Sequence, residues 1–476
     1  MSSPERLEKK VPVRSLSETA FKAVCDNLGA SFKDEKASAS FVCGGTIPMK
    51  SKKQIKVYWH NASSVPQARM PLELPITSSG ENNPIDQLVA DCEAAGFGRN
   101  KETIMDTQYR KAGKLEPSQF ATTFHPGDYG ILDEVSQILV RNLDAGETGL
   151  IPRRVEADLY KLNVYSGPSG LFQKHVDTPR SENQIGSLVV CLPSPFKGGN
   201  LVVRHNGSEL DFPWENHSAD CIQWAAFYSD CEHEIKTVSE GHRITLTYNL
   251  YAKLEVAQPH SSVLDVKSLP LYGLLKDALQ TPGFMNTEEL SSIGVVNQVP
   301  TGGVLGIFCA HVYPHASKGV DKLLPQYLKG ADLCMYAALH SFGFKPDVLP
   351  AIVLYDKDDY GNGEVYACSY PYRRYGVEFE FNDDARVYIG TNLRPLGVMD
   401  NGGEEDYLEL AKEFWQDEKK YDKPITWIST PGHPEPAMAH CSYGNEASAN
   451  FIYSCATIIA EIPEWDERNI MRQLSE

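Results

Sequence analysis

The sequence has 476 residues, of which 42% are hydrophobic and 23% are charged. This length and composition are typical of a folded protein with two or three domains, or of one large barrel with additions. The formal net charge is −18, which disfavours nucleic acid as a partner because binding it needs clustered positive charge. No apolar run approaches the roughly 20 residues that span a bilayer, and Met1–Ser15 is polar. We therefore expect a cytoplasmic protein with no membrane partner.

Eleven cysteines are scattered along the chain, and none of them forms a C-x-x-C pair. An odd and dispersed set is typical neither of a disulfide scaffold nor of a structural zinc site. We expect buried, free thiols in a reducing compartment.

The first 150 residues contain a few predicted elements separated by polar loops. Ile55–Trp59 alternates apolar and polar residues, as a strand does. Pro84–Ala95 begins with proline and is predicted to be a short helix, and a second helix is predicted around Ile131–Leu143. We expect residues 1–150 to form a strand and helix region that supports the part that follows.

The middle of the chain has a different character, with short runs rich in Val, Leu, Ile and Tyr separated by turn residues. Such runs at near-even spacing, without helical periodicity between them, predict an antiparallel sandwich or barrel. We assign residues 151–255 to this core. The predicted strands are Leu159–Tyr165, Gly186–Cys191, Asn200–His205, Cys221–Phe227 and Arg243–Tyr251.

Residues 256–476 are expected to form an α/β extension packed on the core. Gly303–Val312 and Phe451–Ile462 are apolar runs typical of strands. Leu328–Phe342 has helical periodicity, and Glu404–Lys419 is predicted to be an acidic amphipathic helix.

Two histidines, one aspartate and one arginine form an ordered set within the predicted core. His175 and Asp177 are two residues apart, so at a strand end they can point to the same side. His233 follows, and Arg243 opens a strand ten residues later. Two imidazoles and one carboxylate can bind non-haem Fe(II) and leave three positions open. Arg243 can pair with the far carboxylate of a bound 2-oxo acid, and Thr245, on the same strand face, can add a hydroxyl.

Three stretches resemble the prolyl 4-hydroxylase type of Fe(II)/2-oxoglutarate-dependent oxygenase: Asn163–Pro179, Gly198–Val203 and His233–Ile235. The motif-bearing match extends from Leu159 to Leu250, and the flanks look like those of a large fungal subgroup. The peptide-binding loops of the family are not recognisable, so protein prolyl hydroxylation is not carried over.

The resemblance implies a role for each residue of the set. The metal ligands would be His175, Asp177 and His233, the anchor of 2-oxoglutarate would be Arg243, and Tyr165 would lie near this cosubstrate. The cofactors would be Fe(II), 2-oxoglutarate and O2, with ascorbate supportive in vitro. The expected fold is α+β and mainly β: a double-stranded β-helix (jelly-roll, cupin-like) core, helices packed on one side, and a mixed α/β C-terminal extension.

The predicted reaction is oxidation of an unactivated C–H bond, by hydroxylation, desaturation or oxidative ring closure, with release of succinate and CO2. The predicted substrate is a small molecule, such as an amino acid or a secondary-metabolism intermediate, because long flanks favour a closed pocket over an open groove. A peptidyl prolyl hydroxylase-like enzyme and a non-catalytic protein that senses 2-oxoglutarate or oxygen are the alternatives. The oligomeric state is left open.

Arg180 and a second His-x-Glu motif also invite a functional interpretation. Arg180 could pair with a substrate carboxylate or form a surface salt bridge. His433 and Glu435 form a second His-x-Glu, but Pro434 disturbs strand geometry and no arginine opens a following strand, so a loop histidine is favoured.

Overall fold

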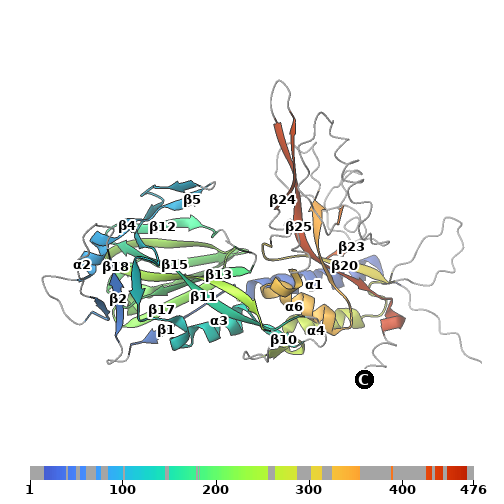
Figure 1. Cartoon of the computed structure of the whole chain (residues 1–476). Helices are drawn as coiled ribbons and strands as arrows, with labels where there is room; N and C mark the ends of the chain where they lie inside the picture. Colours follow the sequence, from blue (N-terminus) through green and yellow to red (C-terminus); the bar gives the residue numbers. More distant parts are fainter. Residues whose placement is uncertain are drawn as a thin grey trace, which may run out of the picture. The chain divides into compact units, whose positions relative to one another are not determined.

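The chain folds into two compact units in the computed structural model (Figure 1). The core unit contains residues 39–142 and 151–263, and the mixed unit contains residues 1–38, 143–150 and 264–476. The structure describes residues 15–38, 41–49, 54–60, 71–76, 84–99, 102–144, 150–177, 181, 183–255, 263–286, 302–313, 324–353, 388–389, 425–430, 435–442 and 448–468.

The core unit is built on two antiparallel sheets that share one long strand, β18 (Glu232–Leu254). In the first sheet, residues 242–254 of β18 lie between β13 and β11. From one edge to the other, its remaining strands are β1 (Val42–Pro48), β17 (Cys221–Tyr228), β13 (Gln184–Cys191), β11 (Arg153–Ser166), β8 (Gly113–Leu115) and β4 (Glu93–Ala94).

The second sheet forms around residues 232–241 of β18. Three strands pair with this half, and β16 and β7 extend the sheet by pairing with β15 and β12. The double-stranded β-helix core predicted from the sequence is therefore confirmed. The strands are β12 (Gly170–His175), β14 (Phe196–Gly198), β15 (Leu201–His205), β16 (Ser208–Phe212) and β7 (Arg110–Lys111).

Gly241 lies where β18 passes from one sheet to the other. Its φ is 72°, a left-handed conformation that side-chain-bearing residues rarely adopt. A Cβ at this position would lie 2.2 Å from the carbonyl oxygen of Pro195. The crossing therefore requires glycine both for its backbone conformation and for its space.

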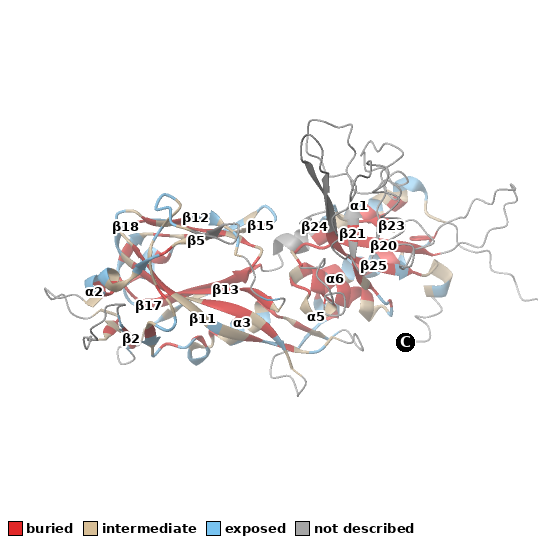
Figure 2. Ribbon diagram, turned by 45° about the horizontal axis from the view of Figure 1, so that its top comes forward, coloured by how far each residue is buried: buried red, intermediate tan, exposed pale blue. Residues whose placement is uncertain are grey.

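The central strands of the first sheet are buried on both faces. Every residue of β13 and β17 is buried, as the red strands in Figure 2 show. Such strands are continuous apolar runs rather than alternating patterns, and this explains why both could be recognised in the sequence.

Helix α3 (Ile131–Leu139) packs on the first sheet, against β1, β11 and β17. Its buried residues, Ile131, Val135 and Leu139, recur every four positions and form one apolar stripe. The prediction of helices packed on one side of the core is thus confirmed.

The other elements of the core unit are β2 (Ile55–Trp59), β3 (Leu72–Leu74), α2 (Pro84–Asp91), β5 (Phe97–Arg99), β6 (Glu102–Ile104), β9 (Phe120–Thr122), η1 (Pro126–Tyr129) and η2 (Trp214–His217).

The mixed unit has a sheet of its own, with the strand order β22-β21-β25-β20-β23, in which β24 also pairs with β25. The β20–β23 pair is parallel and the other described pairs of this sheet are antiparallel. The strands are β20 (Gly303–Phe308), β21 (Asp347–Val353), β22 (Tyr388–Ile389), β23 (Ile425–Trp427), β24 (Glu435–Ser442) and β25 (Ser448–Ile462).

Helix α1 (Glu18–Ser38), which the sequence analysis did not predict, packs against α4 and α6 of the mixed unit. The rings of Phe21 and Phe284 stack with their centroids 5.4 Å apart. The N-terminal helix thus shares a hydrophobic core with C-terminal elements.

The remaining described elements are β10 (Asn142–Asp144), which pairs with β19 (Val263–Asp265), and η3 (Val266–Ser268), α4 (Pro270–Gln280), α5 (Leu324–Tyr327) and α6 (Gly330–Ser341).

Most predicted elements are present, with different ends. Helices α2 and α3 stop at Asp91 and Leu139, four residues before their predicted ends. The predicted helix Glu404–Lys419, Arg180 and His433 lie outside the described residues. The division into residues 1–150, 151–255 and 256–476 stays a prediction. Among the helices that the structure describes, none has the length and apolarity needed to cross a membrane.

Candidate metal centre

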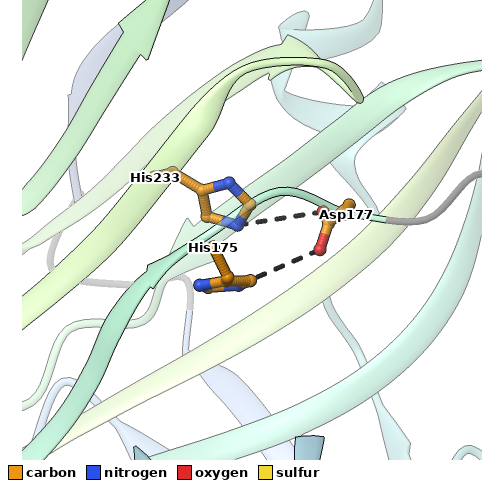
Figure 3. A group of neighbouring side chains, drawn as sticks. All are labelled: His175, Asp177 and His233. Atoms are coloured by element: carbon orange, nitrogen blue, oxygen red, sulfur yellow. Dashed lines mark ion pairs between the residues drawn. The ribbon is translucent and has the colours of Figure 1, made fainter. Parts of the chain in front are cut away.

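The three predicted metal ligands come together beside the paired strands β12 and β18 of the second sheet (Figure 3). His175 ends β12 and lies directly opposite His233 of β18. Asp177 follows β12 by two residues. The Nε2 atom of His233 is 3.8 Å from Asp177 Oδ2, and that of His175 is 4.0 Å from Asp177 Oδ1. One potential ligand atom of each residue lies within 4.8 Å of the other two.

Backbone carbonyl groups hold both histidine rings in place. His175 Nδ1 lies 2.8 Å from the carbonyl oxygen of Gln173, and His233 Nδ1 lies 3.1 Å from that of Cys231. Since a carbonyl oxygen can only accept, Nδ1 of each ring carries the proton and donates it. The lone pair of each neutral ring is then on Nε2, the atom that faces Asp177.

Asp177 accepts a hydrogen bond from Ser187 Oγ of β13 at 2.6 Å. Burial raises the pKa of the Asp177 carboxyl, but the rings of His233 and His175 and the Ser187 hydroxyl lower it by more. Burial, and then the nearby His233, lowers the pKa of His175 well below its ordinary value. An ionised carboxylate and neutral imidazoles are the states in which these side chains bind a metal ion.

Arg243 is fully buried, with 0% of its surface exposed. Its Nε, Nη1 and Nη2 atoms have no hydrogen-bond partner among the described residues. Two aromatic faces lie close, with the guanidinium carbon 5.6 Å from the ring centroid of Tyr165 and 5.1 Å from that of Trp214. Burial lowers the pKa of this guanidinium, yet arginine keeps its proton in proteins. A buried cation without a partner is costly unless a ligand supplies the anion.

Tyr165 and Thr245 line the same cavity as the three candidate ligands. Tyr165 of β11 pairs with Arg243 of β18. Two residues further along β18, Thr245 pairs with Asn163 of β11. The Thr245 hydroxyl donates to the carbonyl oxygen of Asn163 at 3.4 Å. The structure therefore gathers five of the six predicted residues around one cavity and places Arg243 against the ring of Tyr165.

The cavity has a volume of about 730 Å³ and two unlike surfaces. Strands β11, β13 and β18 of the first sheet contribute amides and hydroxyls that bond to one another. Asn163 donates to Thr247 at 3.2 Å, and Gln184 donates to Asn249 at 3.4 Å. Aromatic and apolar side chains line other parts of the cavity, and they include Phe97, Met105, Tyr109, Phe172, Val176 and Phe227.

Ser187, and Thr247 and Asn249 of β18, line the cavity but were not predicted from the sequence. A signal for the two β18 residues was present, because Arg243, Thr245, Thr247 and Asn249 alternate with apolar residues along the strand. Alternation alone predicts a solvent-facing polar side. Here Thr245, Thr247 and Asn249 face a cavity inside the unit.

Two histidines and one carboxylate that leave other coordination positions open are the donor set of non-haem Fe(II) oxygenases. Residues 160–251 match the family model described as the 2OG-Fe(II) oxygenase superfamily. This segment therefore belongs to that superfamily, and the resemblance seen in the sequence is confirmed. The superfamily implies Fe(II), 2-oxoglutarate and O2 as cofactor and cosubstrates.

The search of curated proteins finds no match. Solved structures that resemble the chain include an oxidoreductase of the 2OG-Fe(II) oxygenase family from Burkholderia pseudomallei, at 17% identity over 35% of this chain and 76% of that one, with a TM-score of 0.21. A prolyl-4-hydroxylase from Pseudomonas putida has 17% identity over 47% and 99%, with a TM-score of 0.25. A prolyl hydroxylase from Trichoplax adhaerens, solved with a hypoxia-inducible factor peptide, has 14% identity over 35% and 74%, with a TM-score of 0.23.

The residues present fit the groups that the superfamily implies. Two imidazole nitrogens and a carboxylate oxygen are a donor set suited to Fe(II) with open positions. The unpartnered guanidinium of Arg243 fits a carboxylate such as the distal one of 2-oxoglutarate.

Proposed function

We propose that the protein is an Fe(II)/2-oxoglutarate-dependent dioxygenase that oxidises an unactivated C–H bond of a small molecule. The observation that carries this proposal is the buried, unpartnered guanidinium of Arg243 in the same unit as the His175, Asp177 and His233 cluster. A cluster of possible ligands alone would fit many metal sites, whereas a cationic anchor beside it fits an anionic cosubstrate.

Each side chain has a distinct role in this proposal. His175, Asp177 and His233 hold the iron, and Arg243 holds the distal carboxylate of 2-oxoglutarate, with Thr245 and Tyr165 beside it. When bound, Fe(II) would activate O2, which is the oxidant both for the conversion of 2-oxoglutarate to succinate and CO2 and for C–H cleavage.

The chain's own contribution is to orient these groups and exclude water. Phe172 stacks on His175 with a centroid distance of 3.6 Å, and Phe227 lies 4.6 Å from the ring of His233. Both phenylalanines are buried. They restrict rotation of the two imidazole rings and shield His175 and His233 from solvent.

The dimensions of the cavity support a small-molecule substrate. Its volume of about 730 Å³ falls in the range typical of small-molecule sites. Peptidyl prolyl hydroxylation is the alternative, suggested by the prolyl hydroxylases among the similar structures. The predicted cytoplasmic location and the absence of nucleic-acid and membrane partners remain predictions from composition.

The test is succinate formation by the purified protein with Fe(II), ascorbate, 2-oxoglutarate and air, without added substrate. We expect slow turnover in the wild type and its loss in His175→Ala and Asp177→Ala. Equal signals in wild type and both variants would overturn the proposal. Added prolyl peptides that stimulate turnover, when small molecules do not, would favour the alternative.

A further inference from the structure

Three cationic side chains line the cavity, and they differ in how their charges are balanced. Lys114 and Lys161 both lie near Glu116, at 2.7 and 3.7 Å, and Lys114 is also 3.8 Å from Glu93. Arg110 of β7 forms no ion pair with any residue that the structure describes. The carboxylate that its charge does reach is Asp177, a candidate metal ligand, whose pKa Arg110 helps to lower. Arg110 is therefore the cavity-lining cation that has no carboxylate of its own among the described residues.

Neutral groups hold the Arg110 side chain in a fixed position. Its Nη1 donates to the carbonyl oxygen of Gly96 at 2.8 Å, and its Nη2 donates to Asn163 Oδ1 at 2.9 Å. Its Nε atom is buried and has no partner among the described residues. These contacts orient the guanidinium without neutralising its charge, which is a costly arrangement for a part-buried cation unless a ligand balances it.

Arg110 lies beside the metal centre. Its guanidinium carbon is 4.3 Å from the ring centroid of Phe172, and Phe172 itself stacks on His175 at 3.6 Å. A group bound at Arg110 would thus be close to the metal ligands. The distal carboxylate of 2-oxoglutarate already has its own anchor in Arg243, so a second cation calls for a second anion.

Aromatic and aliphatic side chains also line the cavity around Arg110. The rings of Phe97 and Tyr109 lie 4.2 Å apart, and Tyr109 meets Phe172 edge-on at 6.0 Å. Met105 and Val176 are 58% and 52% exposed and also line the cavity. An occupant of this region therefore meets one positive charge and a broad aromatic and aliphatic surface.

We propose that Arg110 binds a carboxylate of the substrate, which makes the substrate a small carboxylic acid with an apolar body. This inference rests on the proposed oxygenase function and names its substrate class. The guanidinium fork matches a carboxylate, and its single charge balances a monoanion. The acid group fixes one end of the molecule, and the apolar body packs against Tyr109 and Phe97.

The test compares small apolar carboxylic acids with their primary amides, as stimulators of succinate formation above the rate without substrate. The probes are 3-phenylpropanoate, L-phenylalanine and L-leucine, each paired with its amide. We expect at least one acid to stimulate the wild type and its amide to need at least tenfold higher concentration. This comparison needs no variant, so it stands even if a substitution at Arg110 impairs folding.

Arg110→Gln should raise the half-saturating concentration of the stimulating acid at least tenfold, and Arg110→Lys should restore part of the affinity. Arg154→Gln is the matched control, because Arg154 also lies on the core unit but pairs with Glu156 and does not line the cavity; it should leave all values unchanged.

The inference is overturned if amides stimulate as well as acids, if no acid stimulates, or if Arg110→Gln and Arg154→Gln behave alike. A wild type that forms no succinate under any condition would instead contradict the oxygenase function itself, and this inference with it.

Discussion

His175 and His233 lie directly opposite each other on two antiparallel strands, β12 and β18. The register between these strands shifts between Phe172 and His175, so an irregularity in β12 brings His175 level with His233. Residues far apart in the sequence thus become a cross-strand pair. Asp177, two residues beyond, completes the cluster because the chain leaves the sheet at that point.

Ser187→Ala should weaken metal binding. The Ser187 hydroxyl donates to Asp177 at 2.6 Å and holds the carboxylate in its orientation. Loss of such a supporting hydrogen bond typically lowers metal affinity by roughly 10- to 100-fold. Titration with Fe(II) under anaerobic conditions measures the affinity. Ser194→Ala is the control, because Ser194 bonds to the carbonyl oxygen of His242 and does not line the cavity; equal affinities for both variants would contradict the role of Ser187.

Arg243→Met should stabilise the ligand-free protein and abolish its stabilisation by 2-oxoglutarate. Replacing an unpartnered buried cation by an apolar side chain of similar length removes a desolvation cost; even for buried ion pairs, apolar replacement often stabilises a protein by about 1–4 kcal/mol. Thermal denaturation in the presence of Fe(II), with and without 2-oxoglutarate, measures both effects. In the wild type the melting temperature should rise with 2-oxoglutarate. A variant that 2-oxoglutarate stabilises as much as the wild type would show that Arg243 is not the anchor.

Gly241→Ala should destabilise the core unit more than Gly207→Ala does. Both glycines have positive φ, 72° and 81°. A new Cβ would strike the Pro195 carbonyl oxygen at 2.2 Å at position 241, whereas nothing lies within 4 Å at position 207. The left-handed conformation alone costs an alanine roughly 1–2 kcal/mol at either position, so the difference in the free energy of unfolding isolates the steric clash. Equal values from urea denaturation would contradict the account of the β18 crossing.

Native Cys43 and Cys191 should resist alkylation at pH 8. The nine cysteines whose side chains the structure describes are free, and all of these except Cys92 are buried. Burial raises the pKa of Cys43 to about 12 and of Cys191 to about 11. Below these values the unreactive thiol predominates, so labelling should begin only as pH rises towards them or as the protein unfolds. Peptide-resolved mass spectrometry after iodoacetamide treatment checks this, and rapid labelling of the folded protein would contradict it.

The sequence revealed the core of the fold because its strands are long and apolar. Leu159–Tyr165, Gly186–Cys191 and Cys221–Phe227 lie within β11, β13 and β17. The candidate metal ligands could be proposed from the sequence because they form a short motif in a fixed order. His233 joins His175 and Asp177 only because β12 pairs with β18, and no local sequence pattern reveals this pairing.

Arg110 could not be found in the sequence for the same reason. It reaches the cavity because β7 pairs with β12 and places Arg110 opposite Phe172, 62 positions further along the chain. Such long-range strand pairing produces no periodic pattern in the sequence from which it could be predicted. Ser187 was hidden differently: it is one small polar residue within an otherwise apolar run, and its partner Asp177 belongs to the preceding loop.

The central claim is that His175, Asp177 and His233 hold an iron that uses 2-oxoglutarate. Succinate formation by wild type and Asp177→Ala, each with Fe(II) or 2-oxoglutarate omitted in turn, tests it most directly. The account predicts succinate only in the wild type, and only when both are present. Succinate formed by Asp177→Ala at the wild-type rate, or by the wild type after complete removal of iron, would contradict it.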